Sequence, residues 1–400
     1  MENSKKIKVL VVTGIYFPES KINGAILQVR KTINALKNKI YFEVLTDTKI
    51  KGLANHSECD GIKINRIHIS SLWLINFGPK FLVRLYRYFI SIVSHDVIHI
   101  HGYSKRNALI ILLARLLRKR IIIKLTSLGK DDPLSIKHKS YLGWLIFCLS
   151  DYYIATSKAF LDSCLKSNIP EKKYKFIPNC VDANQFSKYE IKEKNILRMK
   201  MGYSKNEFLL LFVGHFSKDK QPQILYEAWK IVKKSGIQVK LIFIGRTHSS
   251  YEVDPEIATR IKSDAHNNEL SSEIIFIEQT DEIDNYMKIS DLYIQPSRRE
   301  GLPNAMLEAM SSSLPCIVRK ISGVTDWVLG KEAAELLVDS DDPKVFANKI
   351  VYLIHNPSES VRLGKILRKI ILDRFLCKNI HSKTLSLYHS MFKSRPTTST

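Results

Sequence analysis

One segment near residue 300 places two carboxylates beside an expected helix start. A strand-like run ends at Gln295, a turn with glycine and proline follows, and a helix is expected to begin near Asn304. The first N–H groups of that helix are free to bind an anionic or hydroxyl-bearing ligand. Glu300 lies in the loop and Glu308 one turn inside the helix, so both can face one small ligand. Either glutamate alone fits a structural role, at the helix dipole or on a solvated face, but the whole string favours a sugar-like ligand.

The elements around this segment alternate between short apolar strands and helices along the whole chain. Runs rich in Ile and Val, separated by helical stretches, predict parallel sheets covered on both faces. The pattern starts again after a polar, charged stretch. We therefore expect an α/β protein with two Rossmann-like, doubly wound domains that face a central cleft. The expected parts are an N-terminal acceptor-binding domain (1–187), a linker (188–205), a C-terminal nucleotide-sugar-binding domain (206–378), and a C-terminal helix and tail (379–400). The helix and tail could pack on either domain, including back on the first.

The composition is that of a folded protein without a membrane span. The 400 residues are 45% hydrophobic and 25% charged, and a chain of this length exceeds one ordinary core. No apolar run reaches the roughly 18–20 residues that a span needs, and we expect no signal peptide. Six cysteines lie far apart without metal-ligand spacing. This argues against a zinc ribbon and a disulfide framework, and it favours a reducing cytoplasm.

The net charge of +23 is concentrated in the N-terminal half. Residues 1–190 carry 31 Lys and Arg against 14 Asp and Glu, whereas residues 191–400 carry 31 against 25. This balance favours a polyanion or an anionic membrane, with a merely solvated surface as the alternative. Lys80, Arg84 and Arg87 recur at helical spacing within an aromatic, apolar stretch. Such a helix can lie on an anionic bilayer, although an ordinary helix packed on the sheet is an equal alternative.

Several motifs, taken together, resemble the retaining glycosyltransferases of family 4 (glycosyl transferases group 1), which have the GT-B fold. The string around Glu300, Pro-Ser-x-x-Glu-Gly-x-Pro, eight residues before Glu-Ala-Met, resembles the Glu-x7-Glu signature of that family. Val213–Phe216, followed by Lys220, resembles its phosphate-binding stretch. Pro178–Asp182 resembles its Pro-Asn-Gly-Val-Asp motif, and Gly14 stands where it has a first-strand glycine loop. The resemblance extends over nearly the whole chain.

The resemblance implies a role for each matching residue. Glu308 would bind the ribose hydroxyls of the donor nucleotide, and Glu300 would hold the transferred sugar. Lys220 would neutralise the departing diphosphate, with His215 beside it. Gly14 would let the backbone approach that diphosphate from the opposite domain. The catalytic candidates are Glu300 and Lys220. The donor-binding candidates are Gly14, His215, Lys220, Glu300, Gly301, Leu302, Pro303, Asn304 and Glu308.

The sequence departs from the family pattern at three of these places. His215 replaces the family arginine, Gln221 replaces the glycine after the lysine, and Cys180 replaces the glycine of Pro-Asn-Gly-Val-Asp. Histidine is only partly protonated near neutral pH, so stabilisation of the diphosphate would depend more heavily on Lys220. Replacement of the two glycines would affect the backbone conformation of the loops that contain them.

The acceptor side carries no histidine that the family motif would assign to the anomeric carbon. The loop from Lys124 to Asp132 instead resembles a branch with a Lys-x-Thr…Gly…Asp loop. His99 and His101 stand at i and i+2 on one side of a strand end, but no further ligand is in register for zinc. We therefore expect no metal site. The acceptor-side candidates are His101, Lys124, Thr126, Gly129 and Asp131.

These features predict a metal-independent hexosyltransferase without a further cofactor. It would move a sugar from a UDP- or GDP-linked donor to a glycan or polyprenyl-linked acceptor, in bacterial surface polysaccharide assembly. A lysine and helix N-terminal amides can offset the leaving-group charge without a metal. Its expected location is the cytoplasm, with the inner face of the cell membrane as the place of its acceptor.

Other functional classes fit the sequence less well. A dehydrogenase would need Gly-x-Gly-x-x-Gly after the first strand, and a nucleic-acid binder would need a recognisable module. Neither pattern is present in the sequence. Two alternatives stay open: a nucleotide-sugar epimerase or phosphorylase on the same fold, and a non-catalytic glycosyltransferase-like partner subunit.

Overall fold

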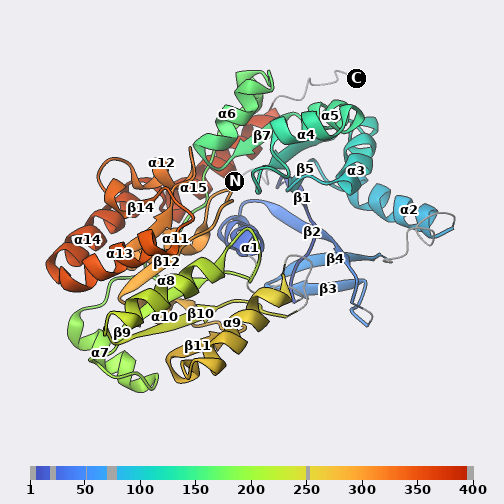
Figure 1. Cartoon of the computed structure of the whole chain (residues 1–400). Helices are drawn as coiled ribbons and strands as arrows, with labels where there is room; N and C mark the ends of the chain where they lie inside the picture. Colours follow the sequence, from blue (N-terminus) through green and yellow to red (C-terminus); the bar gives the residue numbers. More distant parts are fainter. Residues whose placement is uncertain (1–5, 19–23, 51, 70–78, 249–252, 394–400) are drawn as a thin grey trace. The chain divides into compact units, whose positions relative to one another are not determined.

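The structure is a computed structural model that describes residues 6–18, 24–50, 52–69, 79–248 and 253–393. Its contacts divide the chain into two compact units (Figure 1). Unit 1 comprises Met1–Pro178 together with Lys378–Thr400, and unit 2 comprises Asn179–Cys377. Each unit is built around one mainly parallel sheet, which confirms the predicted α/β class with two Rossmann-like domains.

Unit 1 contains an eight-stranded sheet in the order β3-β4-β2-β1-β5-β6-β7-β8. All neighbouring strands are parallel except β3 and β4, which form an antiparallel pair at the edge. The strands are β1 Lys8–Thr13, β2 Tyr41–Thr48, β3 His56–Cys59, β4 Ile62–His68, β5 Val97–His101, β6 Arg120–Lys124, β7 Tyr152–Ala155 and β8 Tyr174–Phe176. The helices are α1 Gly24–Leu36, α2 Pro79–Val93, α3 Lys105–Leu116, α4 Pro133–Lys139, α5 Tyr141–Cys148, α6 Lys158–Lys166 and α15 Cys377–Lys393.

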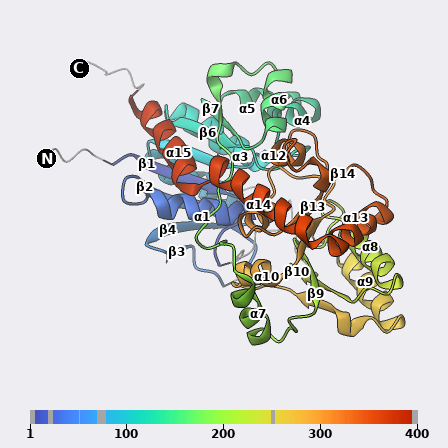
Figure 2. The same cartoon turned by 90° about the vertical axis from the view of Figure 1, so that its left-hand side faces the viewer.

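Both faces of this sheet are covered, as parallel strands require. On one face, Ile98, Ile100 and Ile123 belong to a core that includes Tyr88 of α2 and Phe147 of α5. The other face receives α15, which Figure 2 shows beside β1 and β2. There the Tyr388 hydroxyl lies 2.7 Å from His99 Nδ1, and its ring packs against Phe42. The C-terminal helix is therefore part of unit 1.

Unit 2 contains a six-stranded parallel sheet in the order β11-β10-β9-β12-β13-β14. One large core surrounds it, and its bulkiest fully buried side chain is Trp229. The strands are β9 Phe208–Val213, β10 Val239–Ile244, β11 Ile274–Ile277, β12 Leu292–Gln295, β13 Cys316–Arg319 and β14 Leu337–Val338. The helices are α7 Ile191–Lys200, α8 Pro222–Lys234, α9 Pro255–Asn267, α10 Ile283–Ile289, α11 Asn304–Ser311, α12 Thr325–Leu329, α13 Pro343–His355 and α14 Pro357–Arg374.

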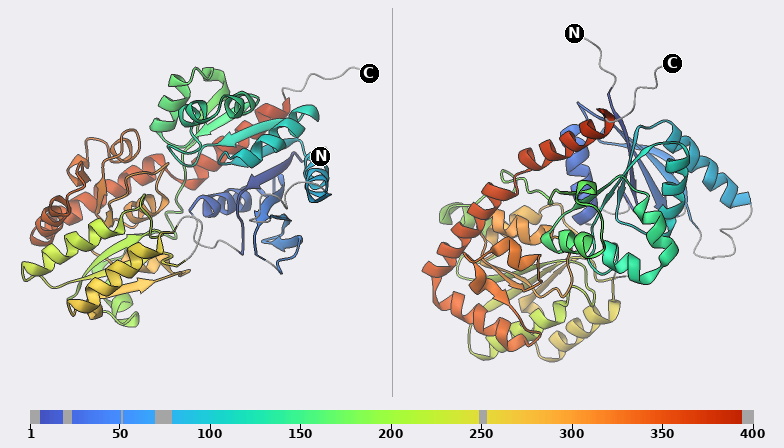
Figure 3. Two further views of the ribbon diagram at one scale, coloured as in Figure 1. Left: turned by 45° about the vertical axis from the view of Figure 1, so that its right-hand side comes forward. Right: turned by 90° about the horizontal axis from the view of Figure 1, so that it is seen from above.

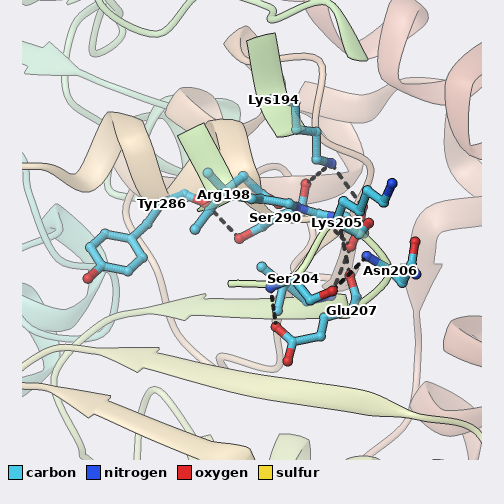
Figure 4. Close-up of polar contacts among 11 residues, drawn as sticks. Lys194, Arg198, Ser204, Lys205, Asn206, Glu207, Tyr286 and Ser290 are labelled. Carbon is cyan, nitrogen blue, oxygen red and sulfur yellow. Dashed lines mark hydrogen bonds and ion pairs between the residues drawn. The ribbon is translucent and has the colours of Figure 1, made fainter. Parts of the chain in front are cut away.

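Residues 188–205, which we interpreted as a linker, include helix α7 and contact the rest of unit 2 closely (Figure 4). The Arg198 guanidinium, 4% exposed, donates to Asp291 Oδ2 at 2.6 Å and to the Ile289 carbonyl at 2.7 Å. Lys194 donates to the other oxygen of Asp291 at 2.9 Å. Since a buried guanidinium needs such partners, this segment is fixed to the connection between α10 and β12.

Cys180 and Cys377 form a disulfide, with their Cα atoms 4.8 Å apart and 197 residues between them in sequence. The prediction that the cysteines form no disulfide was therefore wrong for this pair. Local spacing gave no signal, because the two residues meet only through the tertiary fold. Nearby, the backbone N–H of Val181 donates to the Phe375 carbonyl at 2.9 Å. The disulfide thus joins two segments of unit 2 that already pair through their backbones.

The strand order reverses once near the middle of each sheet, and loops diverge at that point. In unit 1 the reversal lies between β1 and β5, and in unit 2 it lies between β9 and β12. In open parallel sheets, ligands bind outside the carboxyl ends of the strands at such a switch point. The loops that begin at Gly14, Gly102, Gly214 and Pro296 follow these four strands. The topology therefore points to one candidate site in each unit.

Candidate functional site

The candidate site of unit 2 is centred on an ion pair between the loops after β9 and β12. Lys220 Nζ donates to Glu300 Oε1 at 2.6 Å, and the two residues are 80 apart in sequence. Glu300 is 8% exposed, and the Lys220 side chain is 23% exposed. The two catalytic candidates selected from the sequence are therefore in direct contact. A half-buried ammonium beside a buried carboxylate can meet an anion and a sugar hydroxyl at one place.

Contacts between the two loops hold this pair in position. The backbone N–H of Arg298 donates to the Asp219 carbonyl at 2.8 Å. The Arg299 guanidinium forms an ion pair with the Asp219 carboxylate. Since Asp219 precedes Lys220 and Arg299 precedes Glu300, these contacts fix both ends of the ion pair. The loops thus act as one structural element.

Gln221 shows why the family has glycine after this lysine. Its φ is +49°, in the left-handed region that glycine adopts most readily. The residue is 5% exposed and stands at the N-terminus of α8. The left-handed backbone is therefore adopted here without the glycine. This departure from the motif does not displace Lys220 from Glu300.

The second glutamate of the signature lies on the buried side of α11. Glu308 is 7% exposed, which rules out the alternative of a solvated helix face. Helix α11 begins at Asn304, as expected, and no side chain caps its N-terminus. Asn179 Nδ2 donates to Asn304 Oδ1 at 2.9 Å, which connects the Pro-Asn motif to this helix start. Two of the motifs recognised in the sequence thus meet in unit 2.

Gly245, which no sequence motif singled out, shapes the loop that carries Gly214 and His215. Its φ is +150°, and a Cβ built on it would lie 2.1 Å from the Gly214 carbonyl oxygen. Gly214 N in turn donates to the Ile244 carbonyl at 2.8 Å. Only a residue without a side chain allows the ends of β9 and β10 to approach this closely. A glycine directly after a buried strand was the available signal.

The candidate site of unit 1 is a pocket of about 220 Å³ at the carboxyl ends of β1, β2, β5 and β6. It brings together four residues that the sequence predicted as site residues, and it has charged residues at its rim. The lining includes Gly14, Asp47, His101, Arg106, Thr126 and Asp131. Beside Gly14, no described atom lies within 4 Å of a built Cβ, so its need for glycine would come from a ligand. Lys124 and Gly129 are not among the residues that line this pocket.

Asp131 organises the loop at this pocket. Its carboxylate accepts from Thr126 Oγ1 at 2.6 Å and from Ser127 N at 2.7 Å. Burial raises the pKa of Asp131 to about 6, although these hydrogen bonds favour the carboxylate. Asp132 next to it accepts from Gly129 N at 2.6 Å and from Ser135 N at 3.1 Å, at the start of α4. The loop is therefore held by its own two aspartates.

Lys124 and His101 are paired in register on neighbouring strands, so their side chains lie on the same face. Burial lowers the pKa of Lys124 to about 8. Burial, together with the nearby His99 and Lys124, lowers the pKa of His101 well below its usual value. The rings of His99 and His101 lie 4.3 Å apart, and burial lowers the pKa of His99 to about 3. The strand end therefore presents two neutral imidazoles at neutral pH.

Two of the three predicted membrane-binding residues are half-buried. Arg87 is half-buried and donates to Asn55 Oδ1 at 3.1 Å. Arg84 is also half-buried, and its guanidinium stacks over the Phe81 ring at 5.4 Å. The side chain of Lys80 lies outside the described residues. The apolar residues of this helix would allow either of its faces to pack on the sheet. In the structure, the face with Arg87 and Tyr88 packs inward.

Comparison with known proteins identifies matching family models and relatives. The model of the glycosyl transferases group 1 matches residues 193–370, and that of Glycosyltransferase Family 4 matches residues 22–185. The chain is 24% identical over 250 residues to the capsular polysaccharide biosynthesis glycosyltransferase CapM of Staphylococcus aureus, covering 62% of this chain and 63% of that protein. It is 27% identical over 233 residues to the UDP-Gal:alpha-D-GlcNAc-diphosphoundecaprenol alpha-1,3-galactosyltransferase of Escherichia coli, covering 57% of each. These two matches thus span less than two thirds of the relatives' length.

Solved structures share the fold over nearly the whole chain. Sucrose-phosphate synthase from Thermosynechococcus elongatus matches with a TM-score of 0.79 at 18% identity, covering 98% of this chain and 100% of that one. Anabaena Alr3699/HepE in complex with UDP and glucose matches with a TM-score of 0.75 at 17% identity, covering 96% and 100%. Among the helices that the structure describes, none combines the length and hydropathy of a membrane span.

Proposed function

Because the chain belongs to the group 1 and family 4 glycosyltransferases and has the GT-B fold, we propose that it is a retaining hexosyltransferase using a nucleotide-diphosphate sugar. The observation that carries the proposal is the contact of Lys220 with Glu300 at the switch point of unit 2. The UDP complex of the structural relative HepE supports a UDP-linked donor. A GDP-linked donor would use the same charges, since both nucleotides carry the diphosphate.

In this proposal, each site residue of unit 2 has a separate role in sugar transfer. Lys220 supplies a fixed positive charge where the leaving diphosphate gains negative charge, and such electrostatic stabilisation accounts for much of the rate enhancement in many enzymes. Glu300 accepts hydrogen bonds from hydroxyls of the transferred sugar, and the free amides at the start of α11 bind its other oxygens. Glu308 binds the ribose. Because Lys220 is held by Glu300 before the donor arrives, little reorganisation is needed at the moment of transfer.

The acceptor in this proposal is a glycan or a polyprenyl-linked sugar, bound at the pocket of unit 1. The printed names of CapM and of the Escherichia coli galactosyltransferase support it, because they concern a capsular polysaccharide and a diphosphoundecaprenol acceptor. With such an acceptor, we propose that the enzyme acts in the cytoplasm at the inner membrane face, in surface polysaccharide assembly. Gly14, His101 and Thr126 are the residues of the pocket that we propose to meet the acceptor or the donor phosphates.

The proposal is tested with a panel of nucleotide sugars, scored for thermal stabilisation and for turnover with and without acceptors. We expect one UDP- or GDP-sugar to raise Tm, and sugar transfer to require an acceptor. Conversion of the donor alone to an isomer would indicate an epimerase, and sugar phosphate formed from a glycan would indicate a phosphorylase. Absence of stabilisation by every nucleotide sugar would indicate a non-catalytic subunit.

Replacement of Glu308 with glutamine should raise the donor KM about tenfold. The amide keeps the shape of the side chain but loses the charge-assisted hydrogen bonds to the ribose, which are about twice as strong as neutral ones. The measurement is steady-state kinetics at varied donor concentration. An unchanged KM would contradict the assignment of Glu308 to the ribose.

Transfer should not depend on a divalent metal. In the proposed mechanism Lys220 and the α11 amides already balance the diphosphate charge. We expect equal initial rates in EDTA and in Mg²⁺ or Mn²⁺. Loss of turnover in EDTA that either metal restores would show that the protein charges are insufficient.

A further inference from the structure

Helix α2 exposes an unbroken row of large apolar side chains. Leu82 and Tyr86 are each 64% exposed, and Val83 is 55% exposed. The same face continues to the end of the helix with Phe89, Ile90 and Val93. The opposite face is in the core of unit 1 through Tyr88 and Ile92. The helix is therefore apolar on both sides, and one side has no partner among the described residues.

The neighbouring helices α3 and α5 also expose large apolar side chains. Helix α3 packs against both α2 and α5, and Figure 3 shows α2 and α3 together at the edge of unit 1. On α3, Leu116 is 78% exposed, and on α5, Tyr141 and Leu142 are 76% and 67% exposed. Isolated exposed leucines are common on proteins, but a row of large apolar side chains along one helix face, as on α2, marks an interaction site. We call the exposed apolar side chains of α2 the apolar face.

The charge of the chain segment that contains α2 selects the class of partner. Residues 61–150, which include α2 to α5, contain 15 Lys and Arg but only the three acids Asp96, Asp131 and Asp132. Asp131 and Asp132 are buried and bonded within their own loop. Arg118, at the end of α3, is exposed. A surface with exposed aromatic and aliphatic side chains on a strongly basic background complements an anionic lipid bilayer.

We propose that the apolar face is a membrane-docking surface, which inserts into the interface of an anionic bilayer. The proposal deepens the proposed function, since it rests on that function for placing a lipid-linked acceptor at the pocket of unit 1. Attachment depends mainly on Tyr86, Phe89 and Ile90, and not on Arg84 and Arg87, which are half-buried. The basic residues nearby strengthen attachment to an anionic surface, and salt weakens that part of the binding.

The test uses the full chain in a vesicle flotation assay. A variant with Tyr86→Ser, Phe89→Ser and Ile90→Ser is compared with a control carrying Ile191→Ser, Ile196→Ser and Met199→Ser on α7 of unit 2. The control residues are at least as exposed, at 76%, 68% and 70%. The vesicles are phosphatidylcholine alone or mixed with phosphatidylglycerol, at low and high salt. We expect wild type and control to bind the mixed vesicles, with part of the binding kept at high salt, and the α2 variant to bind at least tenfold less.

Three results would overturn the proposal. They are no vesicle binding by the wild type, equal binding by the α2 variant, or complete loss of wild-type binding at high salt. A fourth contradicting result would come from sedimentation velocity. If the wild type forms a dimer, the α2 substitutions abolish that dimer, and the wild type binds no vesicles, the apolar face is a self-association interface. Thermal stabilisation by the nucleotide sugar is measured for both variants and should equal that of wild type. If the vesicles bind but no nucleotide sugar does, the proposed function fails while the docking surface stands.

Discussion

Replacement of Lys220 with methionine should lower the rate of sugar transfer by about 100-fold or more. Removal of one fixed donor to developing negative charge costs on the order of 10²–10³ in kcat in other enzymes. Here the ammonium is oriented by Glu300 at 2.6 Å, within loops tied together by Asp219 and Arg299. The measurement is kcat with the donor identified by thermal stabilisation. The loss should lie in kcat more than in KM, because the charge that Lys220 balances develops during bond breaking.

The same loop offers a matched control for this variant. Lys218 is two residues away, its side chain is 89% exposed, and its ion pair with Asp254 spans 3.9 Å. Lys218→Met removes the same charge and should leave kcat within about twofold, since exposed pairs contribute little. Removing Lys220 also leaves Glu300 buried without its cation. Lys220→Arg separates the two effects, because it restores the charge but not the geometry. Wild-type turnover in Lys220→Met would end the assignment of this lysine to the leaving group.

Replacement of Gly245 with alanine should destabilise unit 2 by about 3 kcal/mol or more and disturb donor binding, because overpacking and a backbone conformation unfavourable to alanine each cost about 1–3 kcal/mol. The added methyl would lie 2.1 Å from the Gly214 oxygen and 2.5 Å from the Gly214 carbon, so the backbone before His215 must move. The measurements are Tm and stabilisation by the nucleotide sugar, both of which should fall. The displaced loop carries Lys220, so the loss of donor binding should exceed that expected from stability alone.

Gly236 provides the control for the effect of backbone conformation alone. Its φ is +82°, and no described atom lies within 4 Å of a Cβ built on it. Gly236→Ala should therefore show a smaller loss of Tm and unchanged donor binding. If Gly245→Ala behaves like this control, the close approach of β9 and β10 does not shape the donor loop.

The sequence by itself determined the elements and the identity of the signature. Its strand-like runs matched the central strands of both sheets, because parallel strands buried on both faces must be continuously apolar. The helix start at Asn304 was also readable, since a turn of glycine and proline precedes it. Glu300 and Glu308 were selected because their spacing is set locally, by one loop and one helical turn. Such features depend on neighbours in the chain, and a single sequence contains them.

The tertiary structure alone decided which residues meet across the chain. Lys220 and Glu300 are 80 residues apart, and Cys180 and Cys377 are 197 apart, so no local pattern could pair them. For α2, the sequence shows apolar side chains on both sides of the helix, and periodicity cannot tell which side the sheet will cover. Burial of Tyr88 left Tyr86 outside and turned Arg87 inward. Periodicity shows which faces of a helix are apolar. The area that each face can bury, and the hydrogen-bond partners available to its polar residues, determine which face packs on the sheet.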